Sequence, residues 1–359
     1  MTNDELQSQT ISYLRFPLTL GIIFIHFDLI EHAFIYQGVH YGLNPPAWFV
    51  LLVNFFSEVF PQIGVPLFFI ISGYLFFFRG QFDGSIYKQK LLKRARTLLI
   101  PYLLWNLLAA MLHDAYILFS GAAQTLIITS PLRLFHDANG TGFPYPINLP
   151  MWYVRDLMVM VVLSPVFFWL LIRMGKWLVM LLGVFFYLYQ PLFAPDGNWC
   201  VLLSHASFFF CWGAYYGIRK ENFVDRFRGY PYLPLLYLPI AVADALTRGT
   251  SYNLMIHQTG VFLGTISAFI IVAYLLERGR VHVNPTLAGS SFFVYALHTS
   301  VLFEVSKIVF IVFCLGDNVW SMLILYFATP LFTAALCVAL YLFLKRFFPA
   351  FCNILTGGR

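Results

Sequence analysis

Charged residues are scarce in this sequence. Asp, Glu, Lys and Arg make up 11% of its 359 residues, whereas about a quarter of the residues in a soluble globular domain are charged. Hydrophobic residues make up 60% and aromatic residues 19%, and the mean hydropathy is +0.76. These values exclude an ordinary soluble domain and predict an integral membrane protein that crosses the bilayer several times.

The sequence also lacks the cysteine spacing that disulfide and metal sites need. None of its five cysteines forms a Cys-x-x-Cys pair or has a histidine at metal-binding spacing. We therefore expect them to be small buried residues, and we expect no metal site. The net charge of +6 does not indicate a nucleic-acid partner, because in a membrane protein the distribution of basic residues matters more than their sum.

Internal repeats, low-complexity tracts and a soluble domain at either end are absent as well. The N-terminal residues MTNDELQSQT are acidic and polar, and no small-residue cleavage site follows the first apolar run. We therefore expect an uncleaved first helix rather than a signal peptide. The sequence predicts a single transmembrane domain over residues 1–359.

Long hydrophobic runs are abundant, and a transmembrane helix needs about 20 mostly apolar residues. The segments that qualify are 11–31, 57–79, 97–119, 151–172, 176–193, 199–218, 232–247, 256–276, 288–314 and 319–344. They predict an all-α, polytopic membrane protein with about ten transmembrane helices.

The basic residues predict the orientation of these helices. If the N-terminus is cytoplasmic, 17 of the 22 Lys and Arg residues fall in cytoplasmic segments, and only Arg133 and Arg248 fall in outer loops. This asymmetry follows the positive-inside rule. We therefore expect both termini in the cytoplasm.

Arg15 and His26 are two ionisable residues on the first predicted helix. Ionisable side chains within the bilayer cost free energy and commonly mark function. The two residues are eleven positions apart, which corresponds to about 20° from three full turns and ~16 Å along the axis. Both therefore project from one face. A histidine in an apolar helix is also commonly a hydrogen-bonded packing residue, and this alternative is open for His26.

Two further stretches suggest where a ligand approaches. In GVPLFFIISGYLFFF, residues 64–78, Ser72 and Gly73 allow close approach of a ligand or of another helix. In KQKLLKRARTLLIPY, residues 88–102, a basic cluster including Lys93, Arg94 and Arg96 precedes a helix. This cluster suits the phosphate groups of a ligand, although an orientation signal alone explains it as well.

A third group of polar residues falls in the predicted outer half of the membrane. Its members are Asp28, Glu31, His32, Glu58, His113, Asp114, Arg155, Asp156, Glu304 and Lys307. Trp152 and Tyr153 adjoin this group and suit sugar binding, although an interfacial aromatic belt also explains them. His298 lies near mid-depth on the ninth predicted helix, where it binds substrate or only packs.

Five stretches in chain order resemble the acyltransferase family 3 membrane proteins. Arg15 and His26 match the family's Arg-x10-His pattern, and GVPLFFIISGYLFF is similar to its second-helix signature. KLLKRARTLLIPY resembles a basic Arg-x-x-Arg stretch, with Lys93 in place of the first arginine. PMWYVRDLMVMVVLSP resembles the fourth helix, and SFFVYALH resembles a late Tyr-to-His segment.

The resemblance implies transfer of an acyl group, usually acetyl, from acyl-CoA to a hydroxyl of an extracytoplasmic or lipid-linked sugar. The chain looks like the short form that lacks an appended soluble domain and modifies surface glycans in the bacterial inner membrane. In this interpretation acetyl-CoA is the donor, the bilayer and a glycan acceptor are the partners, and no metal or nucleic acid takes part.

Each candidate residue has a role in this scheme. Arg15 and His26 are the candidate catalytic residues. Lys93, Arg94 and Arg96 hold the phosphates of coenzyme A, and its arm passes Arg15, Ser72 and Gly73 to reach His26. His26 acts as the general base or becomes acylated, and the residues do not decide between these mechanisms. The acceptor lies near a set of outer residues comprising Trp152, Tyr153, Arg155, His298 and Glu304.

Two alternatives from other classes are open. A polar path with Arg, His and Glu also suits a proton-coupled transporter or flippase for a polysaccharide or small solute. A structural partner of a glycan synthase is the third interpretation, and it predicts that changes at Arg15 and His26 affect stability alone.

Overall fold

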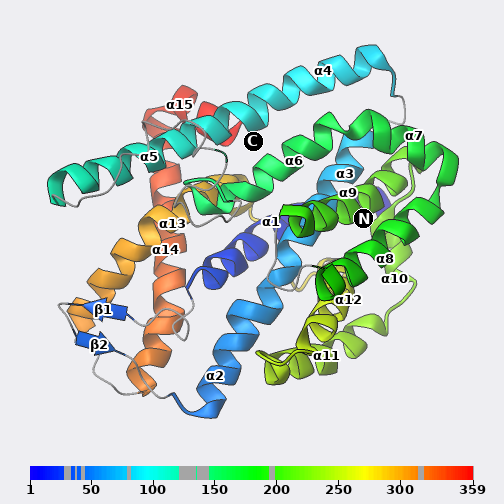
Figure 1. Cartoon of the computed structure of the whole chain (residues 1–359). Helices are drawn as coiled ribbons and strands as arrows, with labels where there is room; N and C mark the ends of the chain where they lie inside the picture. Colours follow the sequence, from blue (N-terminus) through cyan, green and yellow to red (C-terminus); the bar gives the residue numbers. More distant parts are fainter. Residues whose placement is uncertain are drawn as a thin grey trace. The chain divides into compact units, whose positions relative to one another are not determined.

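Helices form almost all of the described structure (Figure 1). The computed structural model of the chain describes residues 1–27, 34–36, 39–41, 45–78, 82–120, 135, 145–193, 199–313 and 319–358. Within these ranges the strands are β1 (Phe34–Tyr36) and β2 (Val39–Tyr41), which pair antiparallel in a small hairpin. The predicted all-α fold class is therefore confirmed, with this hairpin as an addition.

The chain divides into two compact units. Unit 1 comprises Met1–Leu67 and Asn222–Leu340, and unit 2 comprises Phe68–Glu221 and Tyr341–Arg359. Each unit is built from segments far apart in the sequence, so each depends on long-range packing. The single transmembrane domain over residues 1–359 stays a prediction.

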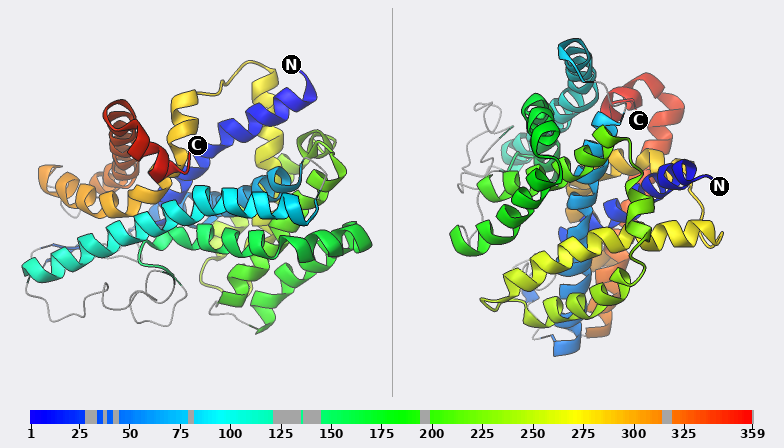
Figure 2. Two further views of the ribbon diagram at one scale, coloured as in Figure 1. Left: turned by 90° about the horizontal axis from the view of Figure 1, so that it is seen from above. Right: turned by 90° about the vertical axis from the view of Figure 1, so that its right-hand side faces the viewer.

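Unit 1 contains the N-terminal helix and most of the C-terminal half of the chain. Its α-helices are α1 (Asn3–Ile25), α2 (Ala47–Val53), α10 (Phe223–Arg228), α11 (Leu233–Thr247), α12 (Asn253–Glu277), α13 (Pro285–Phe313) and most of α14 (Val319–Phe347). A π-helical stretch, η1 (Asn54–Val59), and a 3₁₀ stretch, η2 (Phe60–Ile63), lead from α2 into α3 (Gly64–Phe77). Figure 2 shows α11 and α12 side by side.

Helix α1 begins and ends with defined caps. The Thr2 hydroxyl accepts a hydrogen bond from the Glu5 N–H, while the Glu5 carboxylate accepts one from the Thr2 N–H, which satisfies two free N–H groups. The helix ends at Ile25 with His26 as its C-cap. The predicted span, 11–31, therefore begins inside α1, which starts earlier at a polar capping sequence, and α1 ends at Ile25, while residues 28–31 of that span lie outside the described residues.

The core of unit 1 lies around the C-terminal end of α1. Ile23 and Phe24 pack there with buried residues of α2, α13 and α14. The hydroxyl of Ser57, on η1, donates to the Phe24 carbonyl at 2.9 Å and lies 2.7 Å from the Tyr326 hydroxyl. Buried hydrogen bonds of this kind fix the end of α1 against its neighbours.

Unit 2 consists of the central helices and the C-terminal helix. Its elements are the rest of α3, α4 (Gly84–Arg94), the π-helical η3 (Ala95–Leu99), α5 (Ile100–Ser120), the 3₁₀ stretch η6 (Leu149–Met151), α6 (Trp152–Val162), α7 (Ser164–Met174), α8 (Lys176–Phe193), α9 (Trp199–Arg219) and α15 (Pro349–Thr356). Figure 1 shows α4, η3 and α5 as one continuous helical rod. The Trp105 indole N–H on α5 donates to the Leu355 carbonyl on α15 at 3.0 Å.

Helices α6 and α7 replace one predicted span, 151–172. They meet at Leu163 with a bend of 62°. Pro165 has no N–H to donate to the Val161 carbonyl, so the helix cannot continue regularly. The Ser164 hydroxyl donates to that carbonyl instead, at 2.7 Å, which stabilises the bend.

Each of the ten predicted segments lies on helix in the described residues, although several helices start or end elsewhere. By length and composition, four described helices can cross a membrane, or five if the bent pair counts as one span. Large apolar side chains are exposed along the outer faces of α7, α8 and α11, including Ile172, Leu181 and Leu235. Such faces suit lipid contact. The count of ten spans and the orientation of the termini stay predictions.

Candidate active site

His26 and His298 lie together in unit 1. Their ring centroids are 5.3 Å apart and the ring planes are tilted by 36°. His26 is half-buried at the end of α1, whereas His298 on α13 is fully buried. The packing of α1 against α13 therefore joins two imidazoles that are far apart in the sequence.

One nitrogen of His298 is fixed by the backbone, and the other has no partner in the described residues. Nδ1 lies 2.7 Å from the Tyr295 carbonyl oxygen. Because a carbonyl only accepts, Nδ1 carries the proton, and in the neutral ring Nε2 then has a free lone pair. Nε2 is buried with no hydrogen-bond partner in that part of the chain. A buried acceptor without a partner costs free energy, so such an atom commonly serves a ligand or a reaction.

Arg15 projects from α1, three turns before His26. Its side chain is half-buried, and no carboxylate of the described residues lies within 4.0 Å of its guanidinium. A half-buried cation without a carboxylate partner is costly to hold and is therefore suited to an anionic or strongly polar ligand. Glu304 belongs to α13, but its side chain lies outside the described residues.

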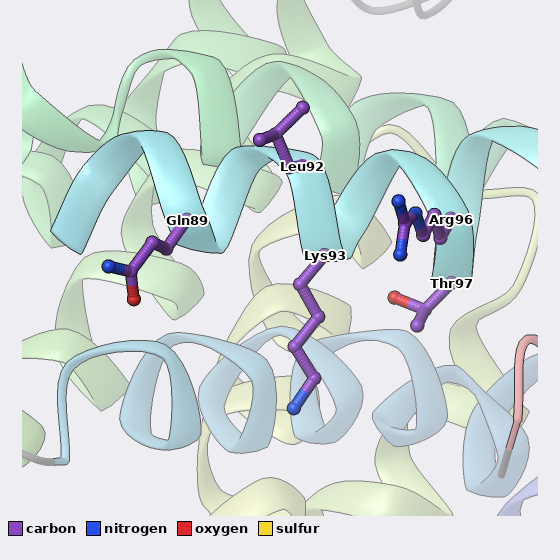
Figure 3. Close-up of a pocket in the computed structure, with 5 residues that line it drawn as sticks. All are labelled: Gln89, Leu92, Lys93, Arg96 and Thr97. Carbon is purple, nitrogen blue, oxygen red and sulfur yellow. The ribbon is translucent and has the colours of Figure 1, made fainter. Parts of the chain in front are cut away.

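Lys93 and Arg96 line a pocket in unit 2 (Figure 3). The pocket has a volume of about 350 Å³, and its other lining residues are Gln89, Leu92 and Thr97. Gln89, Lys93 and Thr97 recur every four residues and point to the same side of the helix in Figure 3. The Thr97 hydroxyl is buried without a hydrogen-bond partner in the described structure. The pocket therefore combines two cations with neutral donors.

Arg94, next to Lys93, belongs to a different cluster. It is half-buried and interacts electrostatically with Tyr153 of α6. The Tyr153 hydroxyl lies 3.2 Å from the Ser72 hydroxyl, and its ring packs edge-on against Phe69 at 4.7 Å. The structure thus joins two of the predicted residues, Ser72 and Tyr153, by a hydroxyl–hydroxyl contact, and Arg94 lies in the electrostatic environment of Tyr153.

Gly73 packs against helix α9. A Cβ atom at this position would lie 2.0 Å from the Phe210 carbonyl oxygen. Gly213 makes the reciprocal approach, since its Cβ would lie 1.9 Å from the Ile70 carbonyl oxygen. This geometry favours helix packing over ligand approach at Gly73, and its role toward the donor stays a prediction.

Arg155 is buried and paired. Its Nε donates to Asp156 Oδ1 at 2.8 Å, and its Nη1 donates to the Phe135 carbonyl at 3.0 Å. Only 6% of Arg155 and none of Asp156 is exposed. This ion pair already compensates the charge of Arg155. Trp152, at the start of α6, is half-buried. The sugar-binding role of both residues stays a prediction.

The sequence did not identify several polar residues that the structure brings near these groups. Gln89 and Thr97 share the pocket of Lys93, and the helical spacing of four indicated this possibility. Ser57 reaches the Phe24 carbonyl near His26 from a stretch predicted as the start of a span. No local pattern marks Ser57, because its contact depends on the packing of η1 against α1.

Comparisons with known proteins give one family and one relative. A family model described as an acyltransferase domain matches residues 9–342. The succinoglycan biosynthesis protein ExoH of Rhizobium meliloti (strain 1021) is 27% identical over 370 residues, which cover 99% of this chain and 94% of that protein. No solved structure matches the chain.

Proposed function

Because this chain belongs to the acyltransferase family and is a membrane protein, we propose that it transfers an acyl group, such as acetyl, from acyl-CoA to a saccharide hydroxyl outside the cytoplasm. The observation that carries the proposal is the contact between the rings of His26 and His298. Nε2 of His298 is buried and has no hydrogen-bond partner among the described residues. Two adjacent imidazoles provide the proton acceptor that attack by a hydroxyl on a thioester requires.

The reaction proceeds through His26. One ring nitrogen of His26 takes the proton of the saccharide hydroxyl while the oxygen bonds to the thioester carbonyl carbon. The carbon–sulfur bond then breaks, and the leaving thiolate of coenzyme A takes the proton from the imidazolium. The products are an O-acyl ester and a free thiol, so no proton is gained or lost.

His298 orients His26 in this mechanism. With its proton fixed on Nδ1 by the Tyr295 carbonyl, His298 presents Nε2 as an acceptor beside the His26 ring. Nε2 accepts no hydrogen bond in the described structure. In the proposed reaction an N–H of His26 turns to donate to this Nε2, which leaves the other His26 nitrogen basic. His298 is a positioning residue in this mechanism, and its direct contact with the substrate stays a prediction.

The donor is held by cationic residues. Lys93 and Arg96, with Gln89 and Thr97 in the same 350 Å³ pocket, suit the phosphate groups of coenzyme A. Arg15 suits a polar group of the donor, because its own charge has no carboxylate partner in the described structure.

The acceptor in this proposal is a polysaccharide or its lipid-linked precursor at the bacterial inner membrane. The similar protein of Rhizobium meliloti is named for succinoglycan biosynthesis, and this relationship supports a polysaccharide acceptor. The positive-inside distribution of Lys and Arg supports an outward-facing acceptor side.

The test is acyl transfer by variants of His26. We expect His26→Ala to reduce acylation of surface polysaccharide by at least about 100-fold, the typical contribution of a general base. Mass spectrometry of polysaccharide from cells with each variant measures this loss. The matched control is His282→Gln, an exposed histidine outside the site. Wild-type acylation in the His26→Ala strain, or absence of acyl transfer by purified wild-type protein, contradicts the proposal.

A further inference from the structure

A second polar cluster lies at the end of unit 1 where α11 connects to α12. His257 Nδ1 on α12 lies 2.8 Å from Asp244 Oδ2 on α11. The Asn253 amide donates to Asp244 Oδ1 at 2.9 Å. Because a carboxylate oxygen accepts, Nδ1 of His257 donates in this contact, and Nε2 lies on the side of the ring away from Asp244 as an acceptor. The side chain of His257 is 18% exposed, so a ligand can reach it.

Arg248 joins this cluster to η1. Its Nη2 donates to the Glu58 carboxylate at 2.6 Å and to the Glu58 carbonyl at 2.7 Å. Its Nη1 lies 3.3 Å from the Asn253 amide oxygen. Its Nε is buried and has no hydrogen-bond partner in the described part of the chain. The cluster therefore has an unused donor on Arg248 in addition to the acceptor on His257.

The cluster adjoins the end of α1 through η1. Glu58 contacts Arg248, and the preceding residue, Ser57, donates to the carbonyl of Phe24. Phe24 lies two residues before His26. Ser57 and Glu58 are consecutive residues of η1, so their Cα atoms are about 3.8 Å apart. Through these two residues η1 contacts both the cluster and the end of α1 that carries His26. A π-helical stretch such as η1 is frequently found at functional sites.

We propose that Arg248, His257 and Glu58, supported by Asp244 and Asn253, bind hydroxyl groups of the acceptor saccharide. This inference rests on the proposed function and adds a binding site for the acceptor. Half-buried carboxylate, imidazole and guanidinium groups together provide the donors and acceptors that a polyol needs. The charge of Arg248 is compensated by Glu58, so the cluster suits a neutral sugar rather than a phosphate.

The predicted topology agrees with this assignment. Arg248 is one of two basic residues predicted in outer loops, and the acceptor of the proposed reaction lies on that side. A purely structural role is the alternative, in which the cluster only ties α11 to α12 and to η1. The two roles differ in their effect on the KM for the acceptor.

The experiment measures KM for both substrates with purified protein in detergent. The acceptor probe is polysaccharide purified from cells that lack this protein, and the donor is acetyl-CoA. We expect Arg248→Lys and His257→Gln to raise the KM for the polysaccharide by about ten-fold each, with the KM for acetyl-CoA unchanged. His282→Gln is the control for histidine replacement and leaves both values unchanged.

Two results overturn the inference. The first is an unchanged KM for polysaccharide in both single variants. The second is recovery of that KM in the charge-swapped double variant Glu58→Arg with Arg248→Glu, because a structural ion pair needs only opposite charges. Unfolding temperatures measured on the same samples identify variants that fail to fold. If Arg248→Lys fails to fold, the KM of the milder variant His257→Gln for polysaccharide decides whether the inference holds. Absence of acyl transfer by the wild-type protein overturns the proposed function itself and is distinguishable from both results.

Discussion

At the residue scale, the most informative atom is Nε2 of His298. It is buried and has no partner among the described residues, and the ring of His26 lies next to it. If His298 were only a packing residue, its second nitrogen would be expected to have a hydrogen-bond partner, as most buried polar atoms do. His282, in contrast, is exposed, so water can satisfy the hydrogen bonds of both its ring nitrogens.

Replacement of His298 tests this interpretation. We expect His298→Gln to lower kcat for acyl transfer by about 100-fold with little change in the KM for acetyl-CoA, because glutamine cannot hold the tautomer of His26 in the same way. Initial rates with labelled acetyl-CoA and purified polysaccharide measure both constants. A kcat equal to that of the wild type would show that His298 only packs.

At the element scale, the contact of α3 with α9 depends on glycine. The two backbones approach so closely that a Cβ on Gly73 would meet the Phe210 carbonyl oxygen at 2.0 Å. Neither atom belongs to a flexible side chain, so one helix would have to move. The close approach explains why a small residue stands at this position in an otherwise bulky, aromatic-rich helix.

Gly73→Ala should therefore destabilise unit 2. We expect a loss of about 3 kcal/mol or more in the free energy of unfolding, which corresponds to severe overpacking. Gly84→Ala is the matched control, because a Cβ at Gly84 in α4 meets nothing within 4 Å. Thermal unfolding in detergent measures the difference. Equal unfolding temperatures for the two variants would contradict the packing argument.

Gly357, the C-cap of α15, lies next to the pocket lined by Lys93 and Arg96. Gly357 has φ +68°, and a Cβ there would lie 2.3 Å from the carbonyl oxygen of Thr97, which lines the pocket. Gly358 has a similar φ of +71°, but a Cβ there meets nothing within 4 Å. Replacing each glycine by alanine introduces backbone strain at both positions, but only the change at Gly357 also introduces a contact with η3. Comparing the two variants therefore distinguishes these effects.

This pair gives a prediction about donor binding. We expect Gly357→Ala to raise the KM for acetyl-CoA by about ten-fold, because Thr97 and its neighbours must shift. Gly358→Ala pays a similar conformational cost of about 1 kcal/mol without that shift. Steady-state kinetics with acetyl-CoA compare the two variants. A larger effect at Gly358 would indicate that strain, rather than contact with Thr97, is decisive.

At the scale of the whole molecule, the distribution of charge predicts the orientation in the membrane. Seventeen of the 22 Lys and Arg residues lie in segments assigned to the cytoplasm. The α4 segment carries part of this charge, whereas the α11–α12 connection lies in a predicted outer loop. The proposed reaction requires that acyl-CoA and the acceptor reach the protein from opposite sides.

Cysteine labelling tests this orientation. Ser85→Cys at the start of α4 and Thr250→Cys between α11 and α12 both replace exposed residues. We expect a membrane-impermeant maleimide to label position 250 in spheroplasts and position 85 only after permeabilisation. Cys211, Cys337 and Cys352 are buried, and both single-cysteine variants are made in a background in which Cys200 and Cys314 are replaced by Ser. Labelling of both positions from the same side would contradict the predicted topology.

The sequence by itself determined the membrane class, the helical fold and the family. Hydrophobic run length is a local property, and the five motifs that resemble the family keep their order along the chain. The sequence also predicted that Arg15 and His26 project from one face of one helix, because residues eleven apart nearly complete three turns. In the structure Arg15 lies on α1, whereas His26 is its C-cap, one residue beyond the helix. Local capping and proline effects were less visible, so the sequence predicted neither the capped start of α1 at Asn3 nor the bend at Leu163.

Only the tertiary structure decided which polar groups meet. His26 reaches His298 because α1 packs against α13, and Arg248 reaches Glu58 because the α11–α12 connection packs against η1. It also showed that the backbone of α9 fills the space beside Gly73 and that Arg155 forms an ion pair with Asp156. Such pairings depend on side-chain contacts between helices that are distant in the sequence, and periodicity along one helix carries no information about its partner.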